Sequence, residues 1–381
     1  MDILLSGLLY LAVYTWTICI TYIAEKKDRL SRKPSKVLAI LIAAIIVPCL
    51  LAGMRDTSVG TDTGGYAINL MNYVIKSDSF AELREVDKTY TEIGYQFFVY
   101  IISRFCLRFE IVLFFTEFMI LLPFIIAIFY VRKELSMTKC IAAFMFCYYH
   151  LSLNLMRQSI AMSLTILACI LFAYCNKKVI AAFVITLAYF FHKFTLIIVL
   201  ILFVAWILKR FLFNPRKRLL IFTAILGCPV FFIPIIFKIS PLILTGAFQK
   251  FVKYVSGEQG IGILTKLRSP SFIIFTLLFI SSWYSYTTSP KKKTKYDVTL
   301  LFLAFLTIEC SFLQAFITYA NRISYFLMPF FILFLARSFK FTLRFKEKDR
   351  AFFFYMLIVV YWLFNGMLSA SSSTAIYKVS F

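Results

Sequence analysis

The chain has 381 residues, of which 61% are hydrophobic and 15% are charged, and its formal net charge is +23. Long apolar runs recur along the whole chain, which excludes an ordinary soluble domain and indicates a polytopic membrane protein with helical spans. The nine cysteines form no CxxC pair, the two histidines have no neighbouring ligand cluster, and most basic residues fall in short loops, so we expect no metal, no cofactor and no nucleic-acid partner.

Apolar runs of the length of a membrane span follow one another from the first residues onward. The first run lacks the basic start and the small-residue cleavage site of a signal peptide, so we count it as a span. The expected spans are residues 3–23, 37–53, 110–131, 138–154, 156–175, 179–192, 194–209, 218–239, 270–288, 297–317, 321–337 and 351–368. The predicted fold is an all-α polytopic integral membrane protein, a single transmembrane domain over residues 1–381 with about 12 transmembrane helices.

The orientation of these spans depends on the run Ile93–Leu107, which is apolar but short and is interrupted by Arg104. If this run does not cross the membrane, six basic loops share one side and hold 26 of the 41 Lys and Arg residues. These loops are residues 24–36, 132–139, 176–178, 209–218, 289–296 and 337–350. Because cytoplasmic loops are rich in Lys and Arg, we predict that both termini face outward. The segment near 93–107 then becomes a short amphipathic, interfacial or re-entrant helix within an external loop, residues 54–109.

The external loop begins with the sequence GMRDTSVGTDTGGY, Gly53–Tyr66, directly after the second span. Taken alone, Arg55 reads as an arginine at a helix end and Asp62 as a solvated aspartate. The neighbouring glycines, among them Gly60, favour a shaped loop for a polar ligand, because glycine permits backbone conformations and close approaches that other residues resist.

Three later motifs bring further polar side chains to the same predicted face. Arg157, in LNLMRQSIAMSL, begins a span on the outer side, where an ionisable residue against its topological preference is a functional candidate. His192, in AYFFHKFTL, and Arg322, in ITYANRISYFL, lie at other outer helix ends. The simpler interpretation is an arginine that anchors a helix at the interface and a histidine that bonds a backbone carbonyl.

Four more polar residues lie within or beside the apolar runs. His150 and Asn154 are one helical turn apart, so both side chains are expected to face the same cavity. Glu117 and Glu309 lie inside predicted spans, where a carboxylate is costly. We expect each of these two to be protonated or to pair with one of the arginines.

Arginines at an outer face suit an anionic ligand, because the guanidinium forms forked hydrogen bonds to phosphate oxygens. The tyrosines at this face suit a sugar, and the surrounding apolar helices suit a lipid tail. An undecaprenyl-diphosphate-linked oligosaccharide combines all three parts. Transfer of its glycan requires cations that stabilise the departing diphosphate and a base that accepts the proton of the acceptor hydroxyl. The candidate bases are Asp62, Glu92 and His192.

Five short motifs occur in order between about Gly53 and Phe326: MRDTSVGTDTGGY, EIGYQ, MRQSIAMSL, FFHKFTL and YANRISYF. Together they resemble motifs of EpsG-like proteins, the Wzy-type polymerases of exopolysaccharide, capsule or O-antigen. The resemblance implies repeat-unit polymerisation at the outer face of the bacterial cytoplasmic (inner) membrane. One departure is that the small hydroxyl residue that often follows the histidine by two positions is here Thr195, three positions on.

The candidate site that results is metal-independent and combines the residues' own chemistry with the motif positions. The catalytic candidates are Asp62, Arg157, His192 and Arg322. The substrate-binding candidates are Arg55, Gly60, Tyr66, Glu92, Tyr95, Asn154, Gln158, Tyr319 and Tyr325. The expected partners are an undecaprenyl-diphosphate-linked oligosaccharide, membrane lipid, a flippase and a chain-length regulator.

Three other functions fit parts of the pattern. A transporter or flippase of lipid-linked glycans is expected to place ionisable residues near the bilayer midplane, whereas this chain gathers them at one face. A lipid-linked-sugar glycosyltransferase faces the same leaving group. A membrane acyltransferase usually places its base in an inner or mid-membrane histidine motif, which the sequence lacks. We therefore predict a glycosyltransferase that polymerises lipid-linked repeat units.

Overall fold

The structure is a computed structural model that describes residues 2–30, 33–87, 89, 91–225, 260–288, 293–317, 320–338, 347–368 and 373–380, without side chains at 347–351. The chain forms two compact units, residues 1–197 with 352–381 and residues 198–351. Regular structure in the described residues is helical, apart from isolated bridges, which confirms the predicted all-α class. That both units belong to one transmembrane domain stays a prediction.

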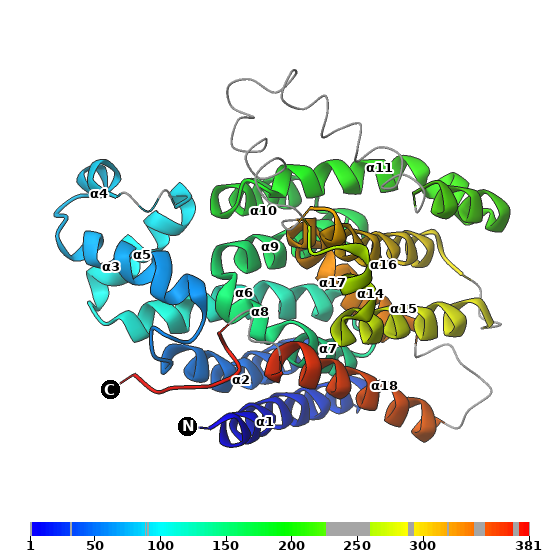
Figure 1. The fold of residues 1–381 in the computed structure, drawn as a ribbon, viewed down its shortest axis with the longest axis horizontal. Coiled ribbons are helices and arrows are strands. Elements are labelled where there is room, and N and C mark those ends of the chain that lie inside the picture. Colours follow the sequence, from blue (N-terminus) through cyan, green and yellow to red (C-terminus); the bar gives the residue numbers. More distant parts are fainter. Residues whose placement is uncertain are drawn as a thin grey trace. The chain divides into compact units, whose positions relative to one another are not determined.

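The first unit is a row of helices with further helices packed on it (Figure 1). Helices α1, α2, α6, α9 and α10 each pack against the next, α7 packs on α1, and α5 packs on α10. Its elements are α1 (Ile3–Leu30), α2 (Pro34–Gly53), η1 (Thr63–Ala67), α3 (Ile68–Ile75), α4 (Phe80–Val86), α5 (Ile93–Phe105), α6 (Phe109–Tyr130), α7 (Met137–Cys147), α8 (Tyr149–Asn154), α9 (Met156–Ala173), α10 (Lys178–Phe191), α18 (Glu347–Trp362) from Phe352 onward and η5 (Leu363–Met367).

The second unit contains most of α11 (Thr195–Phe213) and a helical stretch at residues 215–225. Its other described elements are α14 (Ile263–Arg268), α15 (Pro270–Thr288), α16 (Lys295–Phe312), η3 (Leu313–Ala315) and α17 (Asn321–Ser338). Helices α16 and α17 pack on one another and both contact α15. A capping box at Thr294 and Asp297 begins α16, and Arg337 donates to the same aspartate from the last turn of α17.

Six of the described helices are long and apolar enough to cross a membrane, which agrees with a polytopic membrane protein. They are α1, α2, α6, α9, α11 and α16, the last extended through η3. Shorter apolar helices coincide with further predicted spans. The predicted span 218–239 lies partly outside the described residues, so the count of about 12 spans stays a prediction.

Two predicted segments differ in detail from the structure. The run 138–154, expected as one span, is divided at Tyr148 into α7 and α8. At this break Tyr149 donates to the carbonyl of Pro48 at 2.6 Å, and the hydroxyls of Tyr148 and Ser159 lie 2.9 Å apart. The predicted external loop is largely helical, and its α5 is a 13-residue helix within the expected segment.

Three of the predicted cytoplasmic loops lie together at one end of the first unit. Arg132 pairs with Asp28 at 3.0 Å, which joins the loop after α6 to the end of α1. The Glu25 carboxylate accepts hydrogen bonds from the backbone and side chain of Thr138, at the start of α7. Lys177 lies over the ring of Tyr130, at 5.5 Å from its centroid. These three basic loops therefore lie at one end of α2, α6 and α9, and Arg55 and Arg157 lie at the opposite end of these helices.

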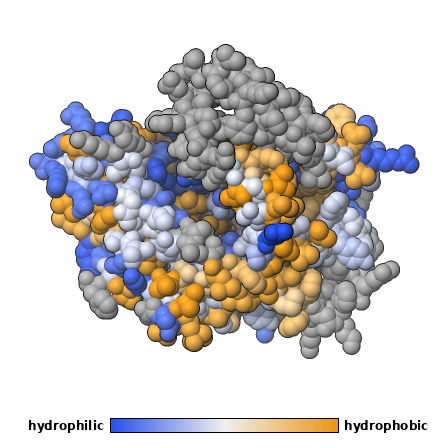
Figure 2. Space-filling model, in the orientation of Figure 1, coloured by the Kyte–Doolittle hydropathy of each residue, from blue (hydrophilic) through white to orange (hydrophobic). Residues whose placement is uncertain are grey.

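The surface of the first unit varies in polarity (Figure 2). Apolar side chains on α1 face outward, with Leu4 71% and Leu8 55% exposed. Hydrophilic side chains cover α4, where Glu82, Arg84 and Glu85 are exposed. This contrast fits helices that contact lipid and an α3–α5 segment that contacts water or headgroups.

Candidate active site

The polar candidates of the first unit gather around the first turn of α9, at the end away from the basic loops. Of the six candidate spans α9 is the most buried, with 78% of its apolar stretch inside the protein. Its small residues, such as Ala161 and Ser163, permit close helix packing. Because α9 packs between α6 and α10, Arg157 in its first turn lies at the centre of this end.

Arg157 forms an ion pair with Glu92, the residue before α5. Its guanidinium also lies over the Tyr66 ring, 4.0 Å from the centroid, which is a cation–π contact. The side chains of Arg157 and Glu92 are 21% and 16% exposed, so the pair is partly buried yet within reach of a ligand. No acidic residue is near this arginine in the sequence, and the structure supplies its partner from 65 positions away.

Two tyrosines continue this cluster inward. The rings of Tyr66 and Tyr95 are 6.0 Å apart in an edge-to-face arrangement, and Tyr95 is fully buried against Thr116 and Met156. Burial raises the pKa of the Tyr66 hydroxyl well above its usual value, although the nearby Arg157 charge opposes the rise. Burial likewise raises the pKa of Tyr95. Both hydroxyls therefore stay protonated at neutral pH, and the Tyr95 ring packs against the Tyr66 ring.

Asp62 lies in the turn before η1, and hydrogen bonds to Asn154 hold this turn in place. The Asn154 side-chain oxygen accepts from the Asp62 backbone at 3.1 Å and from the Thr61 hydroxyl at 2.8 Å. Gly60 has φ of +92°, and a Cβ there would lie 3.0 Å from the carbonyl oxygen of Leu153. The turn thus requires glycine at this position. Asp62 directly precedes η1, which carries Tyr66, so the two residues lie one turn apart. The negative charge of Asp62 adds to the rise in the pKa of Tyr66 that burial causes.

Arg55 is only 1% exposed. Its contacts stabilise the loop, and its side chain is not open to a ligand. It donates to the carbonyls of Ala52 at 3.2 Å and Leu153 at 3.0 Å, and it contacts the Met156 sulfur at 3.2 Å. These bonds join the end of α2 to the junction of α8 and α9. The predicted contact of Arg55 with a phosphate stays a prediction, and its observed contacts are structural.

His192 follows α10 and lies next to the start of α5. Its Nδ1 accepts a hydrogen bond from the Phe194 backbone at 3.3 Å, and the hydroxyl of Thr195 donates to the His192 carbonyl at 2.8 Å. A Cβ at Gly94 would lie 2.7 Å from the backbone of Phe190, so the first turn of α5 rests on the last turn of α10. Glu92 directly precedes α5 and His192 directly follows α10, and these two helix ends are in contact.

A polar tail at residues 373–380 completes this end of the unit, which the sequence did not predict. Arg55 forms an isolated antiparallel bridge with Val379. The Asp56 backbone donates to the carbonyl of Lys378 at 2.8 Å, and Gly60 donates to Ser373 at 3.1 Å. The tail therefore fixes the loop that carries Asp62, although no residue type in it signals this pairing.

The remaining candidates lie elsewhere or make other contacts. Gln158 is buried beside Arg157, 3% exposed. Arg322 and Tyr325 are in α17 of the second unit, where Asn321 donates to the Tyr325 hydroxyl at 3.1 Å, and Tyr319 lies outside the described residues. The participation of Arg322 and Tyr325 in the site around Arg157 stays a prediction.

The two carboxylates inside predicted spans, Glu117 and Glu309, are both buried, and among the described residues neither forms an ion pair with an arginine. Glu117 accepts a hydrogen bond from Ser152 at 2.9 Å and not from an arginine, and the expected alternative, a protonated carboxyl, stays a prediction. One oxygen of Glu309 has no hydrogen-bond partner among the described residues. His150 does not share a cavity with Asn154, because it bonds Trp362 and Thr374 instead.

No group of three or more His, Cys, Asp or Glu residues suited to a metal occurs in the part of the chain that the structure describes. The site is thus an arginine and two carboxylates next to two tyrosines in edge-to-face contact, with a histidine on a neighbouring segment. Such a site can bind an anion through Arg157 and accept a proton on a carboxylate.

Comparison with protein families matches residues 38–380, nearly the whole chain, to the EpsG family. The chain therefore belongs to the EpsG family, which points to a membrane enzyme of the exopolysaccharide polymerase type. Comparison with curated proteins and with solved structures finds no match.

Proposed function

We propose that this member of the EpsG family is a metal-independent glycosyltransferase that joins oligosaccharide repeat units carried on undecaprenyl diphosphate, at the outer face of the bacterial cytoplasmic membrane. The observation that carries the proposal is the convergence of Arg157, Glu92, Tyr66 and Asp62 at the end of the first unit away from its basic loops. A flippase and a chain-length regulator are its proposed partners.

In the proposed reaction Arg157 binds the diphosphate of the donor. Its pairing with Glu92 holds the guanidinium in place before substrate arrives, and phosphate oxygens then compete with Glu92 for its donors. A preorganised cation stabilises charge that develops on the departing diphosphate without reorganising water. Tyr66 fixes the plane of the guanidinium, since its ring lies directly beneath.

Asp62 is the proposed base. The acceptor hydroxyl loses its proton to the Asp62 carboxylate while its oxygen forms the new bond to the anomeric carbon of the donor glycan. The bond from that carbon to the phosphate oxygen breaks, and undecaprenyl diphosphate leaves as the anion. Asn154 and Gly60 hold the turn that presents this carboxylate, which supports a fixed position for the base.

The test replaces the chromosomal gene with the Asp62→Asn variant. We expect cells to make single capped repeat units and no long polymer, at unchanged protein level on a blot. The matched control is Asp56→Asn in the same loop, because the Asp56 side chain accepts a hydrogen bond from the Ser58 backbone that an asparagine side-chain oxygen can still accept. Long polymer from the Asp62 variant would remove this residue from the catalytic set.

The same strains separate polymerase from transporter. Loss of a polymerase leaves single repeat units at the outer face, where they are capped. Loss of a flippase leaves lipid-linked units on the cytoplasmic side, with no capped product. Accumulation on the cytoplasmic side in a deletion strain would contradict the proposed function.

A further inference from the structure

An apolar groove lies directly beside the Arg157–Glu92 pair, between α5, α6 and α10. Its volume is about 580 Å³, and every lining residue is apolar, with walls formed by α5 on one side and Leu187, Phe190 and Phe191 of α10 on the other. A groove without polar groups does not suit a sugar or a phosphate, because neither could form hydrogen bonds there.

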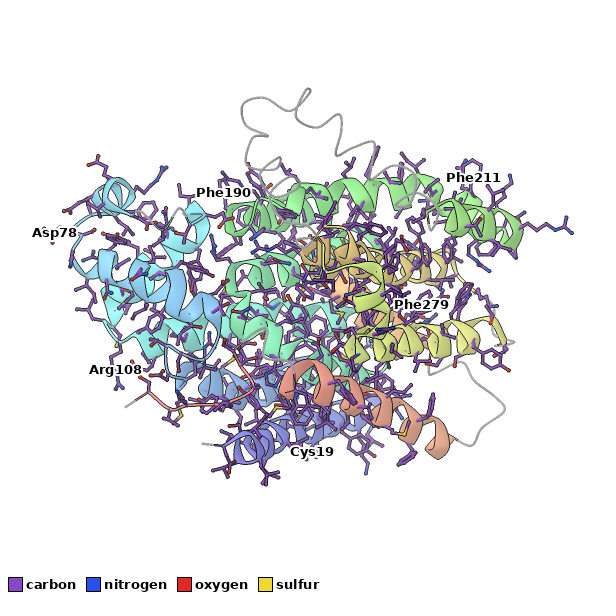
Figure 3. All side chains as sticks on the ribbon, viewed as in Figure 1. Cys19, Asp78, Arg108, Phe190, Phe211 and Phe279 are labelled. Carbon is purple, nitrogen blue, oxygen red and sulfur yellow. The ribbon has the colours of Figure 1, made fainter. Side chains whose placement is uncertain are left out.

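The groove opens to the exterior of the first unit. Phe97 is 51% exposed, Ile101 40% and Phe190 45%, so large apolar side chains line an accessible surface. Phe190 is labelled in Figure 3, on α10. Exposed apolar surface of this kind marks a ligand or membrane contact.

One end of the groove adjoins the charged site. Ile93 and Gly94, which line the groove, directly follow Glu92, the partner of Arg157. Phe190 and Phe191, on the opposite wall, directly precede His192 and the cationic Lys193. A ligand with an anionic head and an apolar chain can therefore place its head at the charged site and its chain in the groove.

We propose that this groove binds the head-proximal part of the polyprenyl chain of the donor lipid while Arg157 holds its diphosphate. The inference rests on the proposed function for the identity of the head group. It assigns α5 a role in substrate binding, because α5 supplies one wall of the groove and, through Glu92 at its start, one side of the charged site.

The test uses the full-length protein in phospholipid nanodiscs and a polyprenyl diphosphate that carries a photoreactive group on its first isoprene units and no sugar. After irradiation the labelled peptides are identified by mass spectrometry. We expect labelling of α5 and α10 within the groove and competition by unlabelled undecaprenyl diphosphate.

Two variants narrow the groove from opposite walls, Ile101→Trp on α5 and Leu187→Trp on α10. The matched control is Ile180→Trp on α10, because Ile180 is also about half exposed, at 49%, but does not line the groove. A tryptophan in either wall occupies volume that the polyprenyl chain would fill, so each groove variant should lose about tenfold in labelling, or about 1.4 kcal/mol in binding, while the control stays within about twofold. Size-exclusion chromatography checks that each variant is folded.

Three outcomes would overturn the inference. These are labelling that maps outside α5 and α10, equal labelling of the Ile101 and Ile180 variants, and labelling by a photoreactive phospholipid that undecaprenyl diphosphate does not displace. The readout does not depend on polymerisation, so the groove and the proposed function can fail separately. Long polymer from Asp62→Asn with normal groove labelling would contradict only the proposed function. Unaltered labelling of Ile101→Trp would contradict only the proposed role of the groove.

Discussion

Replacing Arg157 by lysine keeps the positive charge and removes the planar guanidinium. In the structure this guanidinium forms an ion pair with Glu92 and lies over the Tyr66 ring, 4.0 Å from its centroid. Lysine can keep the ion pair as a point charge, but it cannot present two parallel donors to a diphosphate. The substitution therefore separates the charge of the residue from its shape.

The two contacts predict effects of different kinds. Weakening the ring contact costs about 0.5–2 kcal/mol, which would appear as lower stability of the protein. Losing one preorganised donor to the departing diphosphate costs about 3 kcal/mol of transition-state stabilisation, or about two decades in rate. We expect near-normal protein level and a collapse of the chain-length distribution toward single repeat units.

Arg132→Lys is the matched control for this experiment. Arg132 also pairs with a carboxylate, Asp28 at 3.0 Å, and lies over an aromatic ring, Phe129 at 4.1 Å, but it is at the basic end of the same unit. It should lose similar stability and retain full-length polymer. Full-length polymer from Arg157→Lys, or equal loss of polymer from both variants at equal protein level, would refute the phosphate-binding role of Arg157.

Three further predictions concern the loop, the tail and the topology. Gly60→Ala places a side chain on a backbone with φ of +92°, so it should lower the free energy of unfolding by about 1–2 kcal/mol and cause loss of polymer. Gly65→Ala should be nearly neutral, because Gly65 has open space around it, and thermal unfolding of the purified variants compares the two. Deleting residues 378–381 removes two backbone hydrogen bonds to the segment after α2, so polymer should shorten at similar expression, and unchanged polymer would show that the tail is dispensable. A reporter fused at Asp87 should read external and one at Lys292 cytoplasmic; the same side for both would contradict the interfacial placement of α5.

The sequence determined the helical class and the positions of most helices, because both depend on local properties. A run of about 20 apolar residues has to form a helix in a membrane, since only a helix satisfies the backbone within one segment. The loops at 24–36, 132–139 and 176–178 were also placed together correctly from their charge alone. Short motifs were sufficient to indicate the EpsG family, which the comparison confirms.

The tertiary structure decided which polar side chains meet. Glu92 and Arg157 are 65 positions apart, and their pairing follows from the packing of α5 on α10 and of α10 on α9, for which neither segment carries a local signal. Packing also buried Arg55 as a structural residue and brought the tail at 373–380 back to the loop after α2. Apolar helices can pack in many arrangements of similar hydrophobic energy, so these choices depend on the shapes of side chains across each interface, which a single sequence does not display.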